Sequence, residues 1–174
     1  NAGMADAGIV AWEAKYVYNF WRPIIGVRED DEGTGPSGLG TGSAADGDPF
    51  WRAYGAPASN QPGAINFTPP FPAYPSGHAT FGTTVFEIVR RFYPPAIANN
   101  LTFEFVSDEL NGKTVDVDGS TRTFIKRTYT LDEAIQDNLE SRIWLGVHWR
   151  CDGEGGQQAG VQVAQQIVAS PHLQ

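Results

Sequence analysis

Residues 75–93 read PSGHATFGTTVFEIVRRFY, and this stretch decides the fold that we expect. Pro75 and Ser76 have the pattern of a helix start, because a serine at the cap position accepts a hydrogen bond from the first turn. Apolar residues then recur with helical spacing, which predicts that one face points inward. These inward residues are Val85, Ile88, Val89 and Phe92. The stretch therefore predicts a helix that runs to about residue 93.

Two further helical segments lie outward from this one. Residues 1–20 are rich in alanine and carry apolar side chains, so we expect a helix that ends before Pro23. Residues 26–72 are rich in glycine and proline and have few periodic signals, which is typical of a long functional loop. The last helix is expected from about residue 152 to 169.

The segment between these helices has a different sequence pattern. Residues 101–128 contain two runs typical of strands, and the Asn111-Gly112 and Asp118-Gly119 pairs predict turns between them. Thr130 and Glu133 have the spacing of a capping box, which predicts a helix that runs to about residue 145. The chain is thus expected to be mainly α, with a small β-hairpin, in one domain that spans residues 1–174.

Bulk properties exclude several classes of protein. The net charge is −8, from 12 basic and 20 acidic residues, which disfavours nucleic acids and anionic membranes as partners. No apolar run approaches the roughly 20 residues that span a bilayer. Cys151 is the only cysteine, so no internal disulfide can form, and we expect a free buried thiol there.

Lys15 and Arg22 form the first candidate pattern for chemistry. They are seven residues apart, so on a continuous helix both would lie on one face. A solvated basic face is the ordinary interpretation of such a pair. However, Trp12 and other aromatic residues surround them, so we expect much of this surface to be buried. A buried cation needs an anionic partner.

Pro75-Ser76-Gly77-His78 is the second pattern. The N–H groups of the first helical turn have no intrahelical acceptor and carry the positive end of the helix dipole. Gly77 allows a ligand to approach the backbone closely, and Ser76 is either the helix cap or a ligand contact. A plain capped helix with His78 in its first turn is the alternative.

Arg142, His148 and Asp152 form the third pattern. Arg142 and His148 are six residues apart, which places them about 120° apart on an ideal helix. They can therefore meet only if the helix breaks between them, and Gly146 is the natural position. Asp152 follows His148 by four residues, so its carboxylate could orient the imidazole. A core histidine with a satisfied hydrogen bond is the alternative.

Each pattern has an ordinary explanation alone, but together they supply what a tetrahedral oxyanion requires: fixed cations, backbone donors and two imidazoles. The residues expected to converge are Lys15, Arg22, Ser76, Gly77, His78, Arg142 and His148. His172 stands beside Pro171 without such neighbours, and we interpret it as a surface residue.

The three patterns resemble the signature of the superfamily that joins type 2 phosphatidic acid phosphatases, bacterial acid phosphatases and vanadium haloperoxidases. This signature is Lys-x6-Arg-Pro, Pro-Ser-Gly-His and Ser-Arg-x5-His-x3-Asp, and all three parts occur here in order, from Lys15 to Asp152. The longer strings FTPPFPAYPSGHATFG and SRIWLGVHWRCDG are similar to the chloroperoxidase branch.

The resemblance implies a helical-bundle core and vanadate as the cofactor, with phosphate able to substitute. It implies that vanadium is coordinated by His148, which makes this residue the metal ligand, and that His78 acts as acid and base. Lys15, Arg22 and Arg142 would balance the oxyanion charge, Ser76 and Gly77 would donate hydrogen bonds, and Asp152 would orient His148.

The same resemblance implies an oxidoreductase, a haloperoxidase that uses hydrogen peroxide to oxidise chloride or bromide to hypohalous acid through a peroxovanadate. Organic acceptors of the oxidised halogen would be further partners. Trp12 and Phe71 would border the cofactor and shape the halide approach, although both would also suit a core.

Two alternatives stay open. In a phosphomonoesterase, the same cage would hold phosphate, His148 would attack phosphorus and His78 would protonate the leaving alcohol. In an oxyanion-binding scaffold, the pocket would bind without turnover.

Family members have a helical portion before the first motif, so we expect these residues to be the C-terminal portion of a longer architecture, or to associate with a second copy. The start at Asn1 is typical of a mature form or a fragment. A secreted or periplasmic location is favoured over a cytoplasmic one.

Overall fold

The computed structural model describes residues 1–28, 47–48, 50–54, 68–116 and 118–171. Its elements are α1 (Ala2–Tyr18), α2 (Pro23–Arg28), α3 (Gly77–Phe92), α4 (Pro95–Ala98), β1 (Thr102–Val106), β2 (Lys126–Thr130), α5 (Leu131–Trp144) and α6 (Arg150–Ala169). The expected mainly helical fold with a small two-stranded sheet is confirmed. None of the described helices is both long and apolar enough to cross a membrane.

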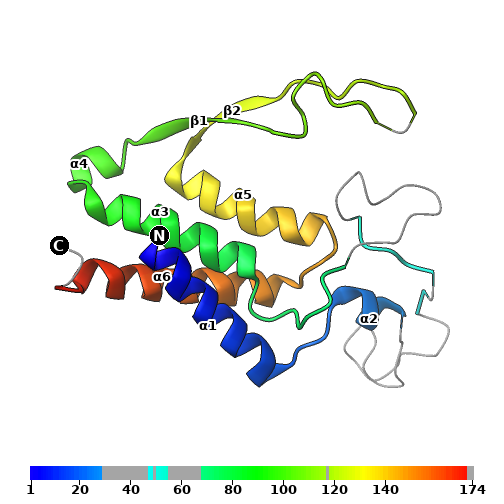
Figure 1. The fold of residues 1–174 in the computed structure, drawn as a ribbon, viewed down its shortest axis with the longest axis horizontal. Coiled ribbons are helices and arrows are strands. Elements are labelled where there is room, and N and C mark those ends of the chain that lie inside the picture. Colours follow the sequence, from blue (N-terminus) through cyan, green and yellow to red (C-terminus); the bar gives the residue numbers. More distant parts are fainter. Residues whose placement is uncertain (29–46, 49, 55–67, 117, 172–174) are drawn as a thin grey trace.

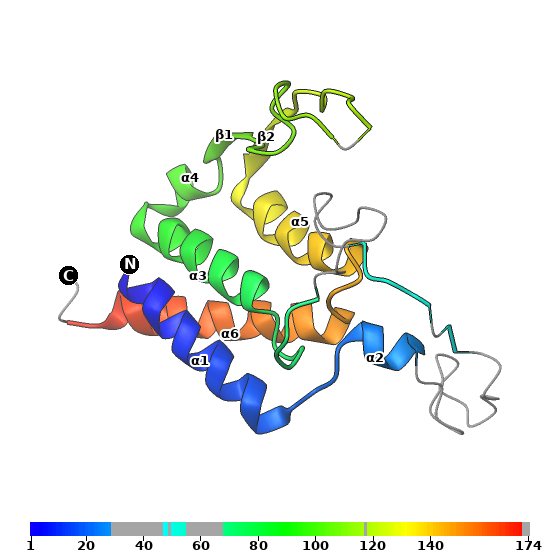
Figure 2. The same ribbon diagram turned by 45° about the vertical axis from the view of Figure 1, so that its right-hand side comes forward.

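Helix α3 lies at the centre of the bundle, with α1, α5 and α6 packed around it (Figures 1 and 2). It begins one residue after the predicted cap, because the Ser76 side chain accepts a hydrogen bond from the Ala79 N–H at 3.4 Å. The predicted inward positions of Val85 and Phe92 are wrong, since these residues are 37% and 77% exposed. The site described below gathers around the N-terminal end of α3.

The closest packing is between α3 and α6, and glycines make it possible. A Cβ atom on Gly156 would lie 2.7 Å from the Ser76 carbonyl oxygen, and one on Gly160 would lie 2.7 Å from the Thr80 carbonyl oxygen. The Thr84 hydroxyl donates across this contact to the Gly160 carbonyl at 3.3 Å. The close contact with α6 therefore fixes the position of the first turn of α3.

The β-hairpin forms as predicted, with β1 and β2 antiparallel and Phe103 paired with Tyr129. Positive φ angles at Gly112 (72°) and Gly119 (82°) accompany the two predicted turns. The predicted capping box of α5 is also present, with the Thr130 hydroxyl accepting from the Glu133 N–H at 3.2 Å. The sheet lies at one edge of the bundle, beside α3 and α5 (Figure 1).

Three local expectations need correction. Helix α1 ends at Tyr18 rather than at residue 20, because Asn19 adopts a left-handed conformation (φ 47°) and its N–H caps the Lys15 carbonyl. Helix α6 begins at Arg150, two residues earlier than predicted. Cys151 is free but exposed rather than buried, since it lies on the outward side of the first turn of α6. His172 lies outside the described residues.

Candidate active site

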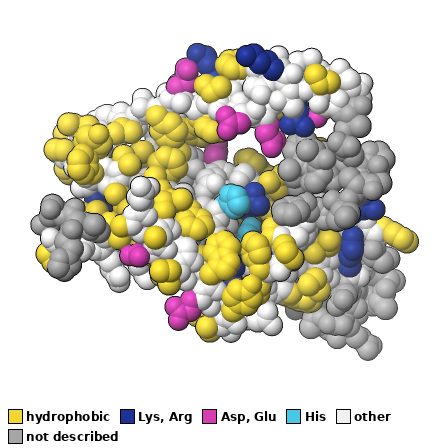
Figure 3. All heavy atoms as spheres, in the orientation of Figure 1, with side chains coloured by type: hydrophobic (Ala, Val, Ile, Leu, Met, Phe, Trp, Pro, Cys, Tyr) yellow, Lys and Arg dark blue, Asp and Glu magenta, His cyan; other side chains and the backbone are white. Residues whose placement is uncertain are grey.

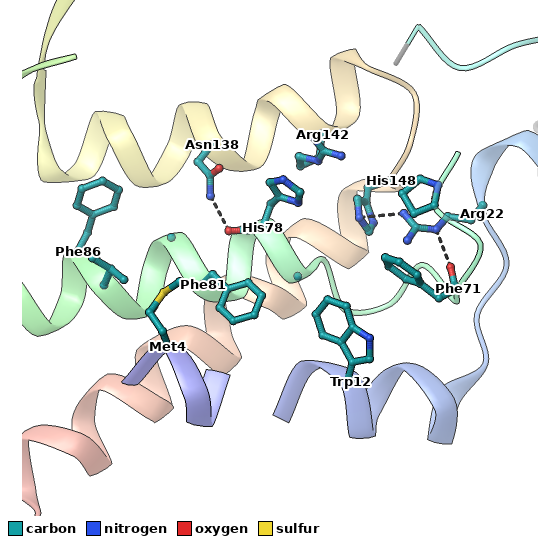
Figure 4. A pocket seen from close by; sticks show the side chains of 14 residues that line it. Met4, Trp12, Arg22, Phe71, His78, Phe81, Phe86, Asn138, Arg142 and His148 are labelled. Atoms are coloured by element: carbon teal, nitrogen blue, oxygen red, sulfur yellow. Dashed lines mark hydrogen bonds between the residues drawn. The ribbon is translucent and has the colours of Figure 1, made fainter. Parts of the chain in front are cut away.

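A cavity of about 430 Å³ opens where α1, α3 and α5 meet the turn that precedes α6. Figure 3 shows histidine and basic side chains together in a depression that hydrophobic side chains surround. Among the predicted site residues, the cavity is lined by Trp12, Arg22, Phe71, Gly77, His78, Arg142 and His148 (Figure 4). Five of the seven residues expected to converge thus line one cavity, and Lys15 and Ser76 do not.

His148 reaches the cavity because the chain leaves α5 at a glycine. Gly146 has a φ of 70°, a conformation that residues with a Cβ rarely adopt, so α5 ends and the chain turns before α6. This is the predicted helix break between Arg142 and His148. His148 is 5% exposed, and its Nε2 lies 3.0 Å from Nη1 of Arg22.

Asp152 holds the other side of the His148 ring, as the spacing predicted. Its Oδ2 lies 3.1 Å from Nδ1 of His148 and accepts from the Trp149 N–H at 2.9 Å. The contact favours the tautomer with the proton on Nδ1, which leaves Nε2 with the lone pair that accepts from Nη1 of Arg22 in this conformation. Burial is the main cause that lowers the pKa of His148 to about 4, and the nearby cations lower it further.

Arg22 is fixed by backbone carbonyls. Its Nε donates to the Phe71 carbonyl at 2.9 Å and its Nη1 to the Val147 carbonyl at 2.7 Å. Because α1 ends at Tyr18, Arg22 lies just before α2 and does not share a helix with Lys15. Burial lowers its pKa to about 10. Arg22 thus faces the cavity as a rigid, buried cation.

Arg142 differs from Arg22, because it donates no hydrogen bond to any described residue. Its Nε is buried and without a partner, and burial lowers its pKa. A buried donor that lacks an acceptor costs about 1–3 kcal/mol, and more when it is charged. An anion in the cavity would satisfy this group.

His78 lies in the first turn of α3 at the mouth of the cavity, beside Arg142 (Figure 4). Its ring remains exposed, while its carbonyl oxygen accepts from the Asn138 amide at 2.7 Å. Burial on the cavity side and the charges of Arg142, Arg22 and Lys15 lower the pKa of His78 to about 4. Both cavity imidazoles are therefore neutral at pH 7.

Lys15 is placed differently from the expectation. It is fully buried, and its Nζ donates to the carbonyls of Pro72 (2.9 Å), Ala73 (3.0 Å) and Pro75 (2.6 Å). An ammonium group has three donors, so all are in use and none is left for an anion in this conformation. Lys15 lies behind the cavity lining, and burial is the main cause that lowers its pKa to about 8.

Ser76 and Gly77 in the Pro-Ser-Gly-His turn have different roles. Ser76 is fully buried behind the cavity as the cap of α3, while Gly77 lines the cavity. A Cβ atom on Gly77 would lie 3.2 Å from Trp12, so glycine keeps the helix start open toward the cavity. The Ser76 N–H donates to the Asp152 carbonyl at 2.8 Å, which ties this turn to the start of α6.

Aromatic residues form the remaining wall. The rings of Trp12 and Phe71 lie 5.4 Å apart, and those of Trp12 and Phe81 lie 6.1 Å apart. The Arg22 guanidinium carbon lies 5.1 Å from the centre of the Phe71 ring. Phe81 and Asn138 were missed from the sequence, although Phe81 follows His78 by three residues and so shares its helix face.

The arrangement suits an oxyanion rather than a bare cation. Two arginines and two histidines line the cavity, and nowhere in the described part of the chain do three His, Cys, Asp or Glu side chains gather as a metal site. Fixed cations and aligned N–H groups stabilise tetrahedral anions.

A helical bundle with such a cage defines a class of oxyanion-binding proteins, and comparison identifies the family within it. The family model described as the VCPO second helical-bundle domain matches residues 1–172, so the chain belongs to this family. It is 42% identical, over 174 residues, to the vanadium chloroperoxidase of Curvularia inaequalis, and the match covers 87% of this chain and 27% of that protein. The chain thus spans about a quarter of that relative's length.

Solved structures show the same fold. A bacterial vanadium-dependent iodoperoxidase matches with a TM-score of 0.63 and 22% identity, over 95% of this chain and 30% of that one. The holo form of a bacterial vanadium-dependent chloroperoxidase matches with a TM-score of 0.60 and 20% identity, over 94% of this chain and 32% of that one.

Proposed function

We propose that this chain is the vanadate-binding catalytic portion of a haloperoxidase that oxidises chloride or bromide with hydrogen peroxide to hypohalous acid. The observation that carries the proposal is the buried Nε of Arg142, which has no partner among the described residues and lies at the cavity that His148 and His78 also line. The relative from Curvularia inaequalis, named as a vanadium chloroperoxidase, supports the choice of chemistry.

The residues fit vanadate by charge and by donor type. His148 is a neutral imidazole, which is the form that binds a metal centre, and its Nε2 would exchange the contact with Nη1 of Arg22 for the metal. Arg22, Arg142 and the N–H groups at the start of α3 would balance and bind the oxygens. Lys15 would reach the anion only by giving up one of its carbonyl acceptors, so its role is to support the cage through charge.

Bound vanadate would supply Lewis-acid activation of hydrogen peroxide. The chain's own groups would then do the positioning and the proton transfer. Asp152 holds the His148 ring through Nδ1 at 3.1 Å, so that Nε2 lies on the side of Arg22, which also lines the cavity. His78 at the mouth would accept a proton from peroxide, because the negative charge of a bound anion raises the pKa of a nearby imidazole. Trp12 and Phe71 would exclude water on the halide side.

A phosphomonoesterase on the same residues is the second candidate, and one observation favours it. A neutral His148 oriented by a buried carboxylate is also a competent nucleophile toward phosphorus. His78 would then protonate the leaving alcohol. Vanadate discriminates between the two functions, because it would inhibit a phosphatase and activate a haloperoxidase.

The test measures bound vanadium by elemental analysis, and bromide oxidation with and without added vanadate. We expect one vanadium per chain and bromide oxidation that depends on vanadate. His148→Ala should lose the bound vanadium. Arg150→Ala is the matched control for loss of a cation, because Arg150 is exposed and pairs with Glu140 at 2.8 Å outside the cavity.

Three results would count against the proposal. Absence of vanadium binding, or full retention of vanadium by His148→Ala, would refute the proposed vanadate site. Hydrolysis of p-nitrophenyl phosphate that vanadate blocks, without bromide oxidation, would favour the phosphatase. Binding without any turnover would favour a scaffold.

A further inference from the structure

Asn138 links the two helices that carry His78 and Arg142. It lies in α5, and Nδ2 of its side chain donates to the carbonyl oxygen of His78, in the first turn of α3, at 2.7 Å. A carbonyl oxygen only accepts, so this bond fixes which end of the amide faces α3. Arg142 follows Asn138 by four residues, so both side chains leave the same face of α5, and both line the candidate active site (Figure 4). The bond therefore joins the helix of one site residue to the backbone of the other.

The approach of Asn138 to α3 depends on a glycine. Gly82 lies one helical turn after His78, and a Cβ atom at this position would overlap Nδ2 of Asn138. A larger residue would therefore displace the amide from the His78 carbonyl. The absence of a side chain at Gly82 is what allows Asn138 to reach across.

The position of the Asn138 side chain depends on its hydrogen bond more than on packing. A second cavity, of about 350 Å³, lies between the β-hairpin and the helices α3 and α5. Gly82, Phe86 and Asn138 line both this cavity and the candidate active site. The Asn138 side chain thus has open space on two sides, and its bond to His78 is the contact that holds it toward α3.

Only two side-chain hydrogen bonds join α3 to α5 in the described part of the chain. The second joins Arg90, in the last turn of α3, to Asp132, in the first turn of α5, at the end of the helix pair away from the candidate active site. The Asp132 side chain is 81% exposed, and exposed ion pairs contribute little to stability. The Asn138 bond is therefore the polar contact that sets the spacing of α3 and α5 beside the cavity.

This spacing decides where the charge of Arg142 lies. No hydrogen bond to a described residue fixes the Arg142 side chain, whose buried Nε is without a partner. The position of the helix that carries Arg142 is then the main constraint on its guanidinium. Burial is the main cause that lowers the pKa of His78 to about 4, and the charge of Arg142 lowers it further. The charges of Arg22 and Lys15 act in the same direction.

We propose that Asn138 is a positioning residue of the candidate active site, whose amide holds α5 against the start of α3 so that Arg142 and His78 face the same bound oxyanion. The proposal rests on the proposed function, which requires an oxyanion in this cavity. It adds a residue that touches neither the anion nor the reacting groups and acts through the two that do.

The first measurement uses the protein without any anion. A titration followed by NMR gives the pKa of the His78 imidazole. Asn138→Leu removes the donor and keeps a side chain of similar size. Gln136→Leu is the matched control, because Gln136 is an exposed amide of the same helix that bonds Glu140 at 3.0 Å outside the cavity. We expect the pKa of His78 to rise from about 4 toward 6.5 in Asn138→Leu, because Arg142 is no longer held beside it, and to stay unchanged in Gln136→Leu.

The second measurement is oxyanion binding. Isothermal titrations with vanadate and, separately, with phosphate give the two Kd values. Asn138→Leu should raise both roughly threefold to tenfold, the range that the loss of one net hydrogen bond predicts. Gln136→Leu should change neither.

Gly82→Ala breaks the same hydrogen bond without any change to Asn138. Its added Cβ takes the place of the Asn138 amide nitrogen, while alanine favours the helix. A protein that folds is therefore available even if Asn138→Leu does not fold. We expect Gly82→Ala to raise the pKa of His78 and both Kd values, as Asn138→Leu does.

Two results would overturn the proposal. One is a folded Asn138→Leu or Gly82→Ala protein in which the pKa of His78 and the Kd values equal those of Gln136→Leu. The other is a lower urea midpoint with neither change, which is what a purely structural contact predicts. Failure of the unmodified protein to bind vanadate or phosphate would refute the proposed function instead. A raised pKa of His78 in both variants would even then support the role of Asn138 in placing Arg142 beside His78.

Discussion

The contact between α6 and the start of α3 gives a quantitative test of how the cage is positioned. Gly156→Ala would place a Cβ atom 2.7 Å from the Ser76 carbonyl oxygen, about 0.7 Å closer than the 3.4 Å at which ordinary contacts begin. The obstacle is backbone, so no side-chain rotation can relieve it. Overpacking of this kind costs roughly 1–3 kcal/mol, while alanine gains about 1 kcal/mol over glycine in a helix.

Gly8→Ala is the matched control for this prediction. Gly8 is also inside a helix, and its added Cβ would meet the Phe81 ring at 3.4 Å, an ordinary contact. Both variants share the gain in helix propensity, so the difference between them isolates the overpacking. We expect Gly156→Ala to have a free energy of unfolding lower than that of Gly8→Ala by about 1–3 kcal/mol.

Urea unfolding followed by far-ultraviolet circular dichroism measures this difference. Because the Ser76 N–H donates to the Asp152 carbonyl, the displacement should also move His148 away from the start of α3 and weaken vanadate binding. If Gly156→Ala proves as stable as Gly8→Ala and binds vanadate equally well, the close contact does not set the geometry of the cage.

Four further predictions concern the charged groups. The pKa values of His78 and His148 are about 4 in the folded protein against 6.5 for a free histidine, so the unfolded state takes up protons first. The urea concentration at the midpoint of unfolding should therefore fall as the pH is lowered from 6.5 to 4. The variant in which both His78 and His148 are replaced by glutamine should show a smaller fall. The pKa of Lys15 is about 8 against 10.5, so stability should rise between pH 8 and 10.5, and Lys15→Met should abolish that rise. Arg142→Gln should weaken vanadate binding at least tenfold in a titration while leaving stability without anion unchanged or higher, because the Arg142 side chain donates no hydrogen bond to a described residue. Arg22→Gln should lower stability as well, since Arg22 donates to the carbonyls of Phe71, Val147 and Pro72.

The features that the sequence predicted correctly depend on local rules. The cap at Ser76 and the capping box at Thr130 follow from residue types at fixed offsets, and both are present. The break at Gly146 followed from the need to bring Arg142 and His148 together, and Gly146 does adopt a positive φ. The contact between His148 and Asp152 was also predicted, but His148 lies before α6 begins at Arg150, so the two residues do not share the helical turn that the prediction assumed.

The features that the sequence could not predict depend on contacts across the chain. The end of α1 at Tyr18 depends on Asn19 entering the left-handed region, which asparagine tolerates but does not require. The wall residue Asn138 bonds the carbonyl of His78, 60 positions away, and no local pattern marks that contact. The second cavity depends on how the hairpin packs against α3 and α5, which strand patterns leave undetermined.

Lys15 was predicted from the sequence as a site residue, but its role could not be predicted from the sequence. The motif places a cation at this position, but the carbonyls of residues 72, 73 and 75 occupy its three donors. An anion that recruited Lys15 would have to compensate for a lost carbonyl bond, which makes the net gain from that contact small. The Arg142 side chain has no such bond to a described residue, so an anion would not have to displace one. Loss of Arg142 should therefore weaken anion binding more than loss of Lys15, although Lys15 is the more deeply buried of the two cations.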